Sequence, residues 1–191
     1  MLATFPITPD WKVLDVGGTF EIWEQCAIRP NLVLLNGNRD VRAFVPGFRS
    51  VRGDGLMLPF PDQSFDLVFS NSVIEHVGDA AAQARFAAEI RRVGKRYWVQ
   101  TPDRGFPVEP HLWTPFLHFL PRRMQRAIAP RFSVWSLVVD ARPDERDFYI
   151  DHCLNTVRLL SHAEVRALFP AATIIRERVM GLSKSLIAAA G

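Results

Sequence analysis

Apolar residues gather in short runs along the first half of the chain, and glycine, proline or polar residues separate these runs. The runs that we interpret as strands are residues 11–16, 32–36, 48–52, 65–69 and 96–101. Most of them are rich in Val, Leu and Phe, which is typical of strands that are covered on both faces. The pattern therefore predicts a buried sheet with parallel strands.

A helical pattern lies between the last two of these strands. Phe86, Ile90 and Val93 recur at helical spacing and form one apolar face. Asp79 is a typical N-cap residue before this pattern, and Gly94 is a typical C-cap residue after it. The spacing predicts a helix that begins after Asp79 and ends at Val93.

The C-terminal part of the chain contains a second helix-start pattern. Ser161 and Glu164 have the spacing of a capping box, in which each side chain bonds to the backbone of the other residue. Leu160 and Val165 are placed to form a hydrophobic staple around the same helix start. The sequence predicts a helix from this point to about Phe169.

The remaining C-terminal residues read as two strands, residues 172–180 and 183–189, joined at Gly181. Alternating strands and helices predict the α/β class, with helices covering the sheet. The 191 residues, of which 48% are hydrophobic and 23% charged, suit one domain of ordinary soluble composition. We therefore expect a single domain.

Residues 103–151 form the least regular part of the chain. Glycine and proline interrupt this segment at Gly105, Pro107, Pro110, Pro115, Pro121 and Pro130. Helices in this segment are therefore expected to be short pieces, such as residues 122–129. The segment is also rich in Phe, Trp, Leu and Arg.

Composition and charge narrow the location and the partners. No apolar run approaches the roughly 20 residues that span a bilayer, and the N-terminus lacks the pattern of a secretory signal. Cys26 and Cys153 are far apart and are expected to be reduced thiols, so a cytoplasmic location is expected. The net charge of +3 is modest and the arginines are mostly spread out, which disfavours nucleic acid as a partner.

Residues 115–139 mix apolar side chains with arginines. A membrane surface is one explanation, and a cap that closes on its own pocket is the favoured one.

The most informative stretch is residues 53–77. It contains the pattern G-D-x-x-x-L-P-F-x-D-x-S-F-D-x-V-x-x-x-x-V-x-E-H, from Gly53 to His76. Short polar side chains, among them Ser70 and Asn71, follow its apolar run, where a parallel strand would open into a ligand crevice. This stretch resembles the class I S-adenosylmethionine-dependent methyltransferases, in their type 11 small-molecule branch. The resemblance extends from about Trp11 to the C-terminus.

The resemblance implies a Rossmann-like, doubly wound, mostly parallel sheet that ends in an antiparallel C-terminal strand. It implies one methyltransferase domain over residues 1–191, with residues 103–151 as a cap insertion that binds the acceptor. The expected reaction moves a methyl group from S-adenosylmethionine to oxygen or nitrogen of a small organic acceptor. The aromatic content of the cap favours a partly hydrophobic acceptor, and Arg104 is expected to address an anionic group on it. The alternative is a catalytically degenerate module that uses the same fold for binding or regulation.

The cofactor-binding residues follow from the positions that match the family's motifs. Asp15 and Gly17 match the first motif, but Thr19 and Glu21 stand where its later glycines usually lie. The family usually carries a carboxylate after the second strand. Here Asn36, Asn38 and Asp40 are the alternatives for a contact with the ribose. The residues implied by the resemblance are Asp15, Gly17, Gly18, Asn36, Asn38, Asp54, Gly55, Leu56, Ser70 and Asn71.

Methyl transfer from a sulfonium needs alignment and exclusion of water more than acid catalysis. A general base is needed only where the acceptor must lose a proton, and histidine titrates in the right range. His76 and His111 are the candidates, with Glu109 placed to orient His111. The alternative for His76 is that the Glu75–His76 pair only orients the loop under the cofactor.

No metal site is expected, because the histidines at positions 76, 111, 118, 152 and 162 show no close pairing along the sequence. The sequence also lacks the nucleophile elbow of hydrolases and the phosphate-binding lysine motif of NTPases. A hydrolase or an NTPase is therefore disfavoured.

Overall fold

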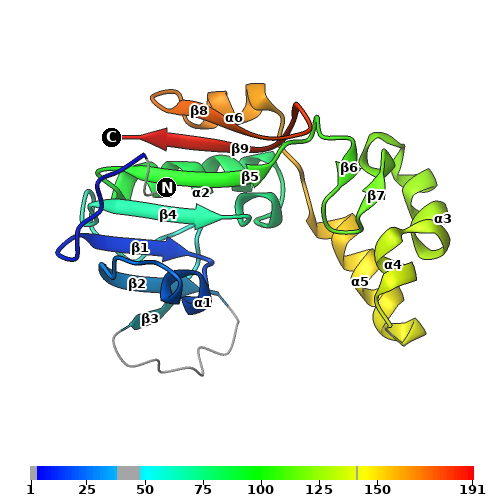
Figure 1. Ribbon diagram of the computed structural model, residues 1–191, viewed down its shortest axis with the longest axis horizontal. Helices are drawn as coiled ribbons and strands as arrows, with labels where there is room; N and C mark the ends of the chain where they lie inside the picture. The colour runs from blue at the N-terminus through cyan, green and yellow to red at the C-terminus, as the bar shows by residue number, and fades with distance from the viewer. Residues whose placement is uncertain (1–3, 38–47, 141) are drawn as a thin grey trace.

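A seven-stranded sheet forms the larger part of the molecule, on the left in Figure 1. The computed structural model describes residues 4–37, 48–140 and 142–191. The strand order is β3-β2-β1-β4-β5-β9-β8. The strands are β1 (Lys12–Val16), β2 (Asn31–Asn36), β3 (Arg49–Arg52), β4 (Leu67–Asn71), β5 (Tyr97–Pro102), β8 (Thr173–Val179) and β9 (Leu182–Ala190).

Strands β1 to β5 pair in parallel, whereas β9 runs antiparallel to β5 and to β8. The predicted α/β fold, with a mostly parallel sheet and an antiparallel C-terminal end, is therefore confirmed. The predicted strand pair around Gly181 is also confirmed, because β8 and β9 flank this glycine. In this order the chain moves outward from β1 in one direction and from β4 in the other. The carboxyl ends of β1 and β4 therefore form a topological switch point.

Two apolar layers cover the sheet, because neighbouring residues of a strand point to opposite faces. Leu14 packs on one face with Phe86 and Ile90 from α2 (Ala80–Val93), and α6 (His162–Leu168) adds Val165 to that layer. Val13 packs on the other face in a cluster with Trp23 from α1 (Phe20–Glu24). Leu14, Val13, Phe86 and Ile90 have no exposed surface.

Both predicted helix starts are confirmed by hydrogen bonds. The carboxylate of Asp79 accepts the Ala82 amide at 2.8 Å, which caps α2. The Glu164 carboxylate accepts the Ser161 amide at 2.8 Å, and the Ser161 hydroxyl accepts the Glu164 amide, so the capping box of α6 is complete. Leu160 and Val165 are both buried in the core, as expected of a staple.

The chain between β5 and α6 folds into a separate lobe beside the sheet (Figure 1). Its elements are β6 (Val108–Glu109), β7 (Thr114–Pro115), the 3-10 helix η2 (Leu117–Phe119), α3 (Arg122–Phe132), α4 (Val134–Val138) and α5 (Pro143–Thr156). Leu112, Leu117, Ile150 and Leu154 are among the residues of its own small core. We refer to residues 108–156 as the lobe.

The prediction that this region holds only short helices was wrong for α5, which has 14 residues. Pro143 stands in its first turn, where a missing amide hydrogen costs no helical bond, so this proline starts a helix and does not break one. Residue 151 lies inside α5, so the end of the predicted cap segment falls within a helix. In the part of the chain that the structure describes, no helix combines the length and apolarity that a bilayer crossing requires.

Candidate functional site

A cavity of about 460 Å³ opens at the carboxyl ends of the parallel strands, at the switch point. Its walls come from the ends of β1 and β2, the turn after β3, the residues on either side of η1 (Ile74–His76), and α2. We call it the first cavity. Its volume lies in the range of small-molecule sites, which are roughly 300–1,000 Å³.

Five of the ten predicted cofactor residues line the first cavity: Gly17, Asn36, Asp54, Gly55 and Leu56. Asp15, Gly18, Ser70 and Asn71 are not among its lining residues. Asn38 and the alternative Asp40 lie outside the described residues. The structure thus brings residues from three separate motifs to one cavity.

The turn after β1 depends on two glycines. Gly17 has a φ of +80°, and a Cβ there would lie 2.6 Å from a methyl carbon of Val73. A Cβ on Gly18 would lie 1.9 Å from the carboxylate of Asp15, so any side chain would collide with it. The Asn36 side-chain amide donates to the Gly18 carbonyl at 3.0 Å. Asn36 therefore holds this turn as well as lining the cavity.

Asp15 lies beneath the glycine turn and has no exposed surface. The indole N–H of Trp23 donates to its Oδ2 at 2.7 Å, whereas its Oδ1 has no partner among the described residues. Burial raises the pKa of Asp15 to about 7, although the bond from Trp23 lowers it in part. This carboxylate supports the turn from below and does not reach the cavity.

Asp54 begins a tight turn after β3. Its Oδ1 accepts the Leu56 amide at 2.8 Å, and its side chain is exposed. The Leu56 amide is therefore already used within the turn. Asp54 both closes its own turn and lines the cavity.

The polar residues at the end of β4 have different positions. Ser70 is buried, and its hydroxyl donates to the Val16 carbonyl at 3.1 Å, so it ties β4 to β1. Asn71 is the last residue of β4 and is exposed. Their predicted contact with the cofactor remains a prediction.

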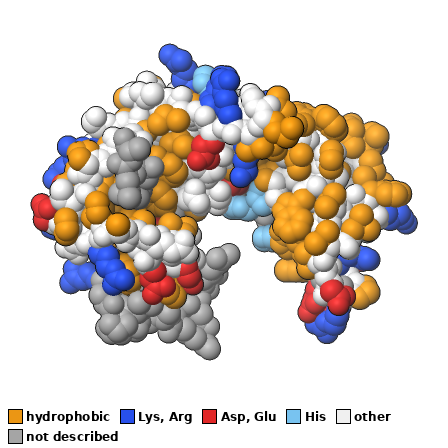
Figure 2. Space-filling model, in the orientation of Figure 1, with side chains coloured by type: hydrophobic (Ala, Val, Ile, Leu, Met, Phe, Trp, Pro, Cys, Tyr) orange, Lys and Arg blue, Asp and Glu red, His pale blue; other side chains and the backbone are white. Residues whose placement is uncertain are grey.

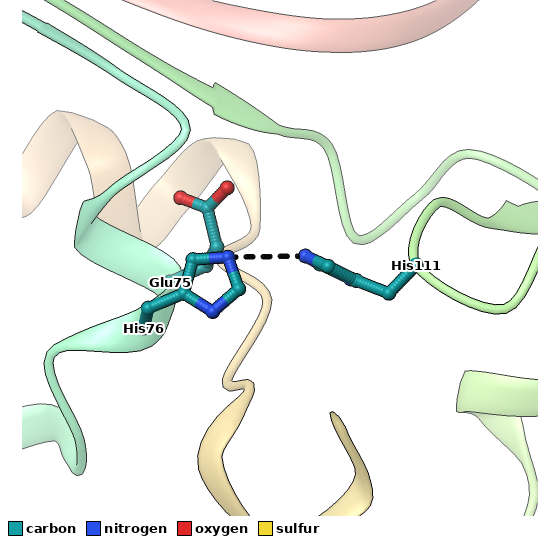
Figure 3. Close-up of side chains that lie close together, drawn as sticks. All are labelled: Glu75, His76 and His111. Atoms are coloured by element: carbon teal, nitrogen blue, oxygen red, sulfur yellow. Dashed lines mark hydrogen bonds between the residues drawn. The ribbon is translucent and has the colours of Figure 1, made fainter. Parts of the chain in front are cut away.

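A group of titratable side chains meets beside η1 (Figure 3). His76 from η1 and His111 from the loop after β6 approach with 3.2 Å between their Nε2 atoms. Glu109 accepts a hydrogen bond from Nδ1 of His111, with 2.9 Å between Oε1 and Nδ1. The two histidines are therefore far apart in the sequence but adjacent in the folded chain.

The two carboxylates of this group are buried, and their pKa values are shifted in opposite directions. Burial would raise the pKa of Glu109, but hydrogen bonds from the His111 ring and from the amides of Leu112 and His111 hold it below its usual value. Burial raises the pKa of Glu75, which has no exposed surface and accepts a bond from the Thr101 hydroxyl at 2.9 Å. Glu109 is therefore an ionised orienting group for His111.

A second cavity of about 400 Å³ lies between the end of the sheet and the lobe. Its walls include Ser72, Gln100, Asp103, Phe106 and Trp113. Figure 2 shows an open notch between the sheet and the lobe, with histidine side chains at its upper end and many apolar side chains on the lobe.

Arg104 forms an ion pair with another residue of the chain. Its guanidinium lies 3.5 Å from the carboxylate of Glu164 on α6. It also lines a third cavity, of about 320 Å³, together with Arg122 and Arg158. The expectation that Arg104 addresses an anionic group therefore has to include competition from Glu164.

Sequence reasoning missed part of both site groups. Val73, Val77 and Phe86 line the first cavity, although none of them was a candidate site residue and Phe86 was assigned only to the apolar face of a helix. Phe86 reaches the cavity through contacts that depend on how α2 packs on the sheet. Glu75 was seen only as an orienting residue, and the motif that contains it was the available signal.

Known proteins resemble part of the chain. Residues 27–97 match the family model of a methyltransferase domain. A ubiquinone/menaquinone biosynthesis C-methyltransferase from Xanthomonas campestris is 34% identical over 108 residues, which cover 49% of this chain and 43% of that protein. The chain spans less than half the length of the two curated relatives that it matches, 29% of one and 43% of the other.

Solved structures share the fold over nearly the whole chain. An S-adenosylmethionine-dependent methyltransferase from Mesorhizobium loti aligns with a TM-score of 0.57 and 14% identity, covering 98% of this chain and 93% of that one. A Rhodobacter sphaeroides protein described as a zinc-dependent alcohol dehydrogenase aligns with a TM-score of 0.67 and 11% identity, covering 96% and 84%. At these identities the likeness shows the fold alone.

The match of residues 27–97 to a methyltransferase domain and the shared fold both support the resemblance to the class I S-adenosylmethionine-dependent methyltransferases that the sequence shows. S-adenosylmethionine is the cofactor that defines this class of enzymes.

Proposed function

We propose that this protein transfers the methyl group of S-adenosylmethionine to oxygen or nitrogen of a small organic acceptor. One observation carries the proposal. The first cavity, lined by the residues of the methyltransferase motifs, lies at the switch point, and the paired histidines lie on elements that flank both it and the second cavity. Val73 and Val77, which line the first cavity, stand directly before and after η1 in the sequence. Ser72 and Pro110, which line the second cavity, stand close in sequence to His76 and His111 respectively.

The cofactor suits the residues present. The cavity wall includes glycine backbone at Gly17 and Gly55, where a Cβ would collide with Val73 or Phe86, so the main chain packs directly against the side chains that complete the wall. Asp54 is an exposed carboxylate at the rim, and carboxylates are good acceptors for amino groups and hydroxyls. When bound, S-adenosylmethionine supplies an activated methyl group on a sulfonium.

In this account the chain's own residues position the acceptor and receive its proton. Glu109 accepts the Nδ1–H of His111, so the lone pair of His111 is on Nε2 and faces His76. A hydroxyl or ammonium group of the acceptor that lies by this pair can pass its proton to an imidazole nitrogen. The contribution of the sheet and the lobe is to hold the reacting atoms in line.

The composition of the lobe supports a partly hydrophobic acceptor. Exposed apolar side chains on it include Trp113, Phe116, Phe119, Phe132 and Phe148. The relative from Xanthomonas campestris is named as a C-methyltransferase of quinone biosynthesis. A carbon acceptor is therefore the competing chemistry at the same site. The same apolar side chains could instead rest on a membrane surface and reach an acceptor there, but we favour a cap over the protein's own pocket.

The second candidate function is a module that binds the cofactor or a related nucleoside without turnover. Two features favour it. The described end of β2 carries the amide of Asn36, which is already bonded to Gly18, in the place of the usual carboxylate. Thr19 and Glu21 also replace the later glycines of the first motif.

An acceptor survey with methyl-labelled S-adenosylmethionine tests the proposal. The panel contains matched aromatic hydroxyl, amine and carbon acceptors, each assayed with and without anionic liposomes. We expect label on an oxygen or nitrogen acceptor, with His111→Ala lowering the rate by roughly 10²–10⁴-fold, the usual worth of a general base. His152→Ala, an exposed histidine of α5, is the matched control and should leave the rate unchanged. Label only on carbon would contradict the acceptor type, and cofactor binding without any transfer would favour the module.

A further inference from the structure

The side chains of Glu75, His76 and His111 converge from two distant parts of the chain (Figure 3). Each of them offers one atom that can bind a metal, and these atoms all lie within 4.8 Å of one another. We infer that these three residues bind a divalent transition-metal ion beside the first cavity. This inference deepens the proposed function and rests on it for its role in catalysis.

The spacing of the two histidines fits two ligands of one ion. Imidazole nitrogens bind such ions at about 2.1 Å, so two of them at an angle of about 100° lie about 3.2 Å apart. The Nε2 atoms of His76 and His111 are 3.2 Å apart. Two imidazole lone pairs cannot face each other at this distance without a cation between them. A proton fills that position when the two rings share a hydrogen bond, and a metal ion can take its place.

The third ligand is a buried carboxylate that is only half satisfied. Glu75 has no exposed surface, and its Oε2 accepts the Thr101 hydroxyl. Its Oε1 is buried and has no hydrogen-bond partner among the described residues. A buried carboxylate oxygen without a partner is costly, and coordination of a cation removes that cost. Binding requires a small movement of this side chain toward the two rings.

The surroundings of His111 are those of a metal ligand. Histidines that bind metals almost always donate their other ring N–H to a carboxylate or a carbonyl, which fixes the tautomer and the ring orientation. Glu109 does this for His111, with 2.9 Å between Oε1 and Nδ1. The amides of His111 and Leu112 hold the other oxygen of Glu109 in place. This outer support is more than a solvent-exposed histidine pair would need.

The ligand set indicates the kind of metal and its use. Two imidazoles and one carboxylate favour zinc or a similar first-row ion over calcium or magnesium, which prefer oxygen ligands. Three protein ligands leave coordination positions open for an acceptor hydroxyl, or for a hydroxyl with a neighbouring carbonyl. With the ion bound, the two histidines are ligands and do not accept the proton. The ion instead lowers the pKa of the acceptor hydroxyl, so the proton leaves to solvent. The oxygen then forms a bond to the methyl carbon as the carbon–sulfur bond breaks, and the sulfur keeps the electron pair as neutral S-adenosylhomocysteine.

Cobalt titration of the chelator-treated full chain, followed by visible absorption, tests the inference. We expect one Co²⁺ per chain with a Kd in the micromolar range or tighter. Binding should weaken by at least 100-fold in His76→Ala and His111→Ala, and by about 10–100-fold in Glu109→Gln, which removes only the outer support. His152→Ala is the matched control and should leave the affinity unchanged.

Thermal unfolding of each variant shows whether it is folded, and Glu109→Gln keeps the shape of the side chain if the alanine variants unfold. Absence of binding, or binding that both His76→Ala and Glu109→Gln leave intact, overturns the inference. Titration with S-adenosylmethionine is run on the same samples. A chain that binds the cofactor but no cobalt loses only the metal site. A chain that binds cobalt but no cofactor keeps the metal site and loses the proposed function.

Discussion

The Asp15→Asn variant is expected to be more stable than the parent protein at pH 8, and the two are expected to be equally stable near pH 4. Asp15 is fully buried, and burial raises its pKa from 3.8 to about 7. Between these two pH values the unfolded chain ionises this group while the folded chain keeps it protonated. The unfolded state therefore binds fewer protons, and the free energy of unfolding falls as the pH rises.

The size of this effect follows from the shift. Each pH unit between about 4 and 7 removes about 1.4 kcal/mol, so the total is on the order of 4 kcal/mol and is constant above pH 7. Asparagine keeps an oxygen for the Trp23 indole and carries no charge, so it removes the loss. Urea denaturation of both proteins at several pH values measures the difference. A difference in stability between the two proteins that does not change with pH would contradict the assignment of a buried carboxyl group with a raised pKa beneath the glycine turn.

Phe86→Ala is expected to destabilise the protein by about 3–5 kcal/mol, the usual range for a phenylalanine in a packed core. Phe86 has no exposed surface, packs in the main core and lies against Gly55 at the first cavity. Its removal leaves a hole that is continuous with the cavity. We therefore expect weaker cofactor binding together with the loss of stability.

Phe148→Ala is the matched control for this substitution. The Phe148 side chain on α5 is 74% exposed, so its loss should change the free energy of unfolding by no more than about 0.5 kcal/mol. Denaturation curves of the two variants and the parent, recorded in one buffer, give the comparison. Equal stability of Phe86→Ala and Phe148→Ala would show that α2 does not pack on the sheet as described.

The sequence predicted the sheet and the helix starts because these depend on local chemistry. Asp79 and Ser161 cap helices through bonds within one turn, and the apolar runs give strands wherever both faces are covered. The turn at Asp54 also follows from the sequence, because a tight turn after a strand is a local structure. These features need no knowledge of the rest of the fold.

Other features depend on contacts between distant segments. His76 and His111 are 35 residues apart in the sequence, and only the path of the chain through β5 and the start of the lobe brings their rings together. Phe86 was predicted as a core residue, and its additional position at the cavity depends on how α2 lies on the sheet. The length of α5 was missed because the prolines of residues 103–151 were taken together as a sign of short helices, whereas Pro143, in the first turn of α5, is favoured there.

Calorimetric titration of the full chain with S-adenosylmethionine, and in parallel with S-adenosylhomocysteine, tests the central claim most directly. We expect micromolar binding of both compounds in the first cavity. Asp54→Ala should weaken binding by roughly 10–100-fold, which corresponds to the loss of a hydrogen bond to a charged group. Asp144→Ala, an exposed carboxylate on α5, should bind like the parent. Failure of the folded parent protein to bind either compound would contradict the account.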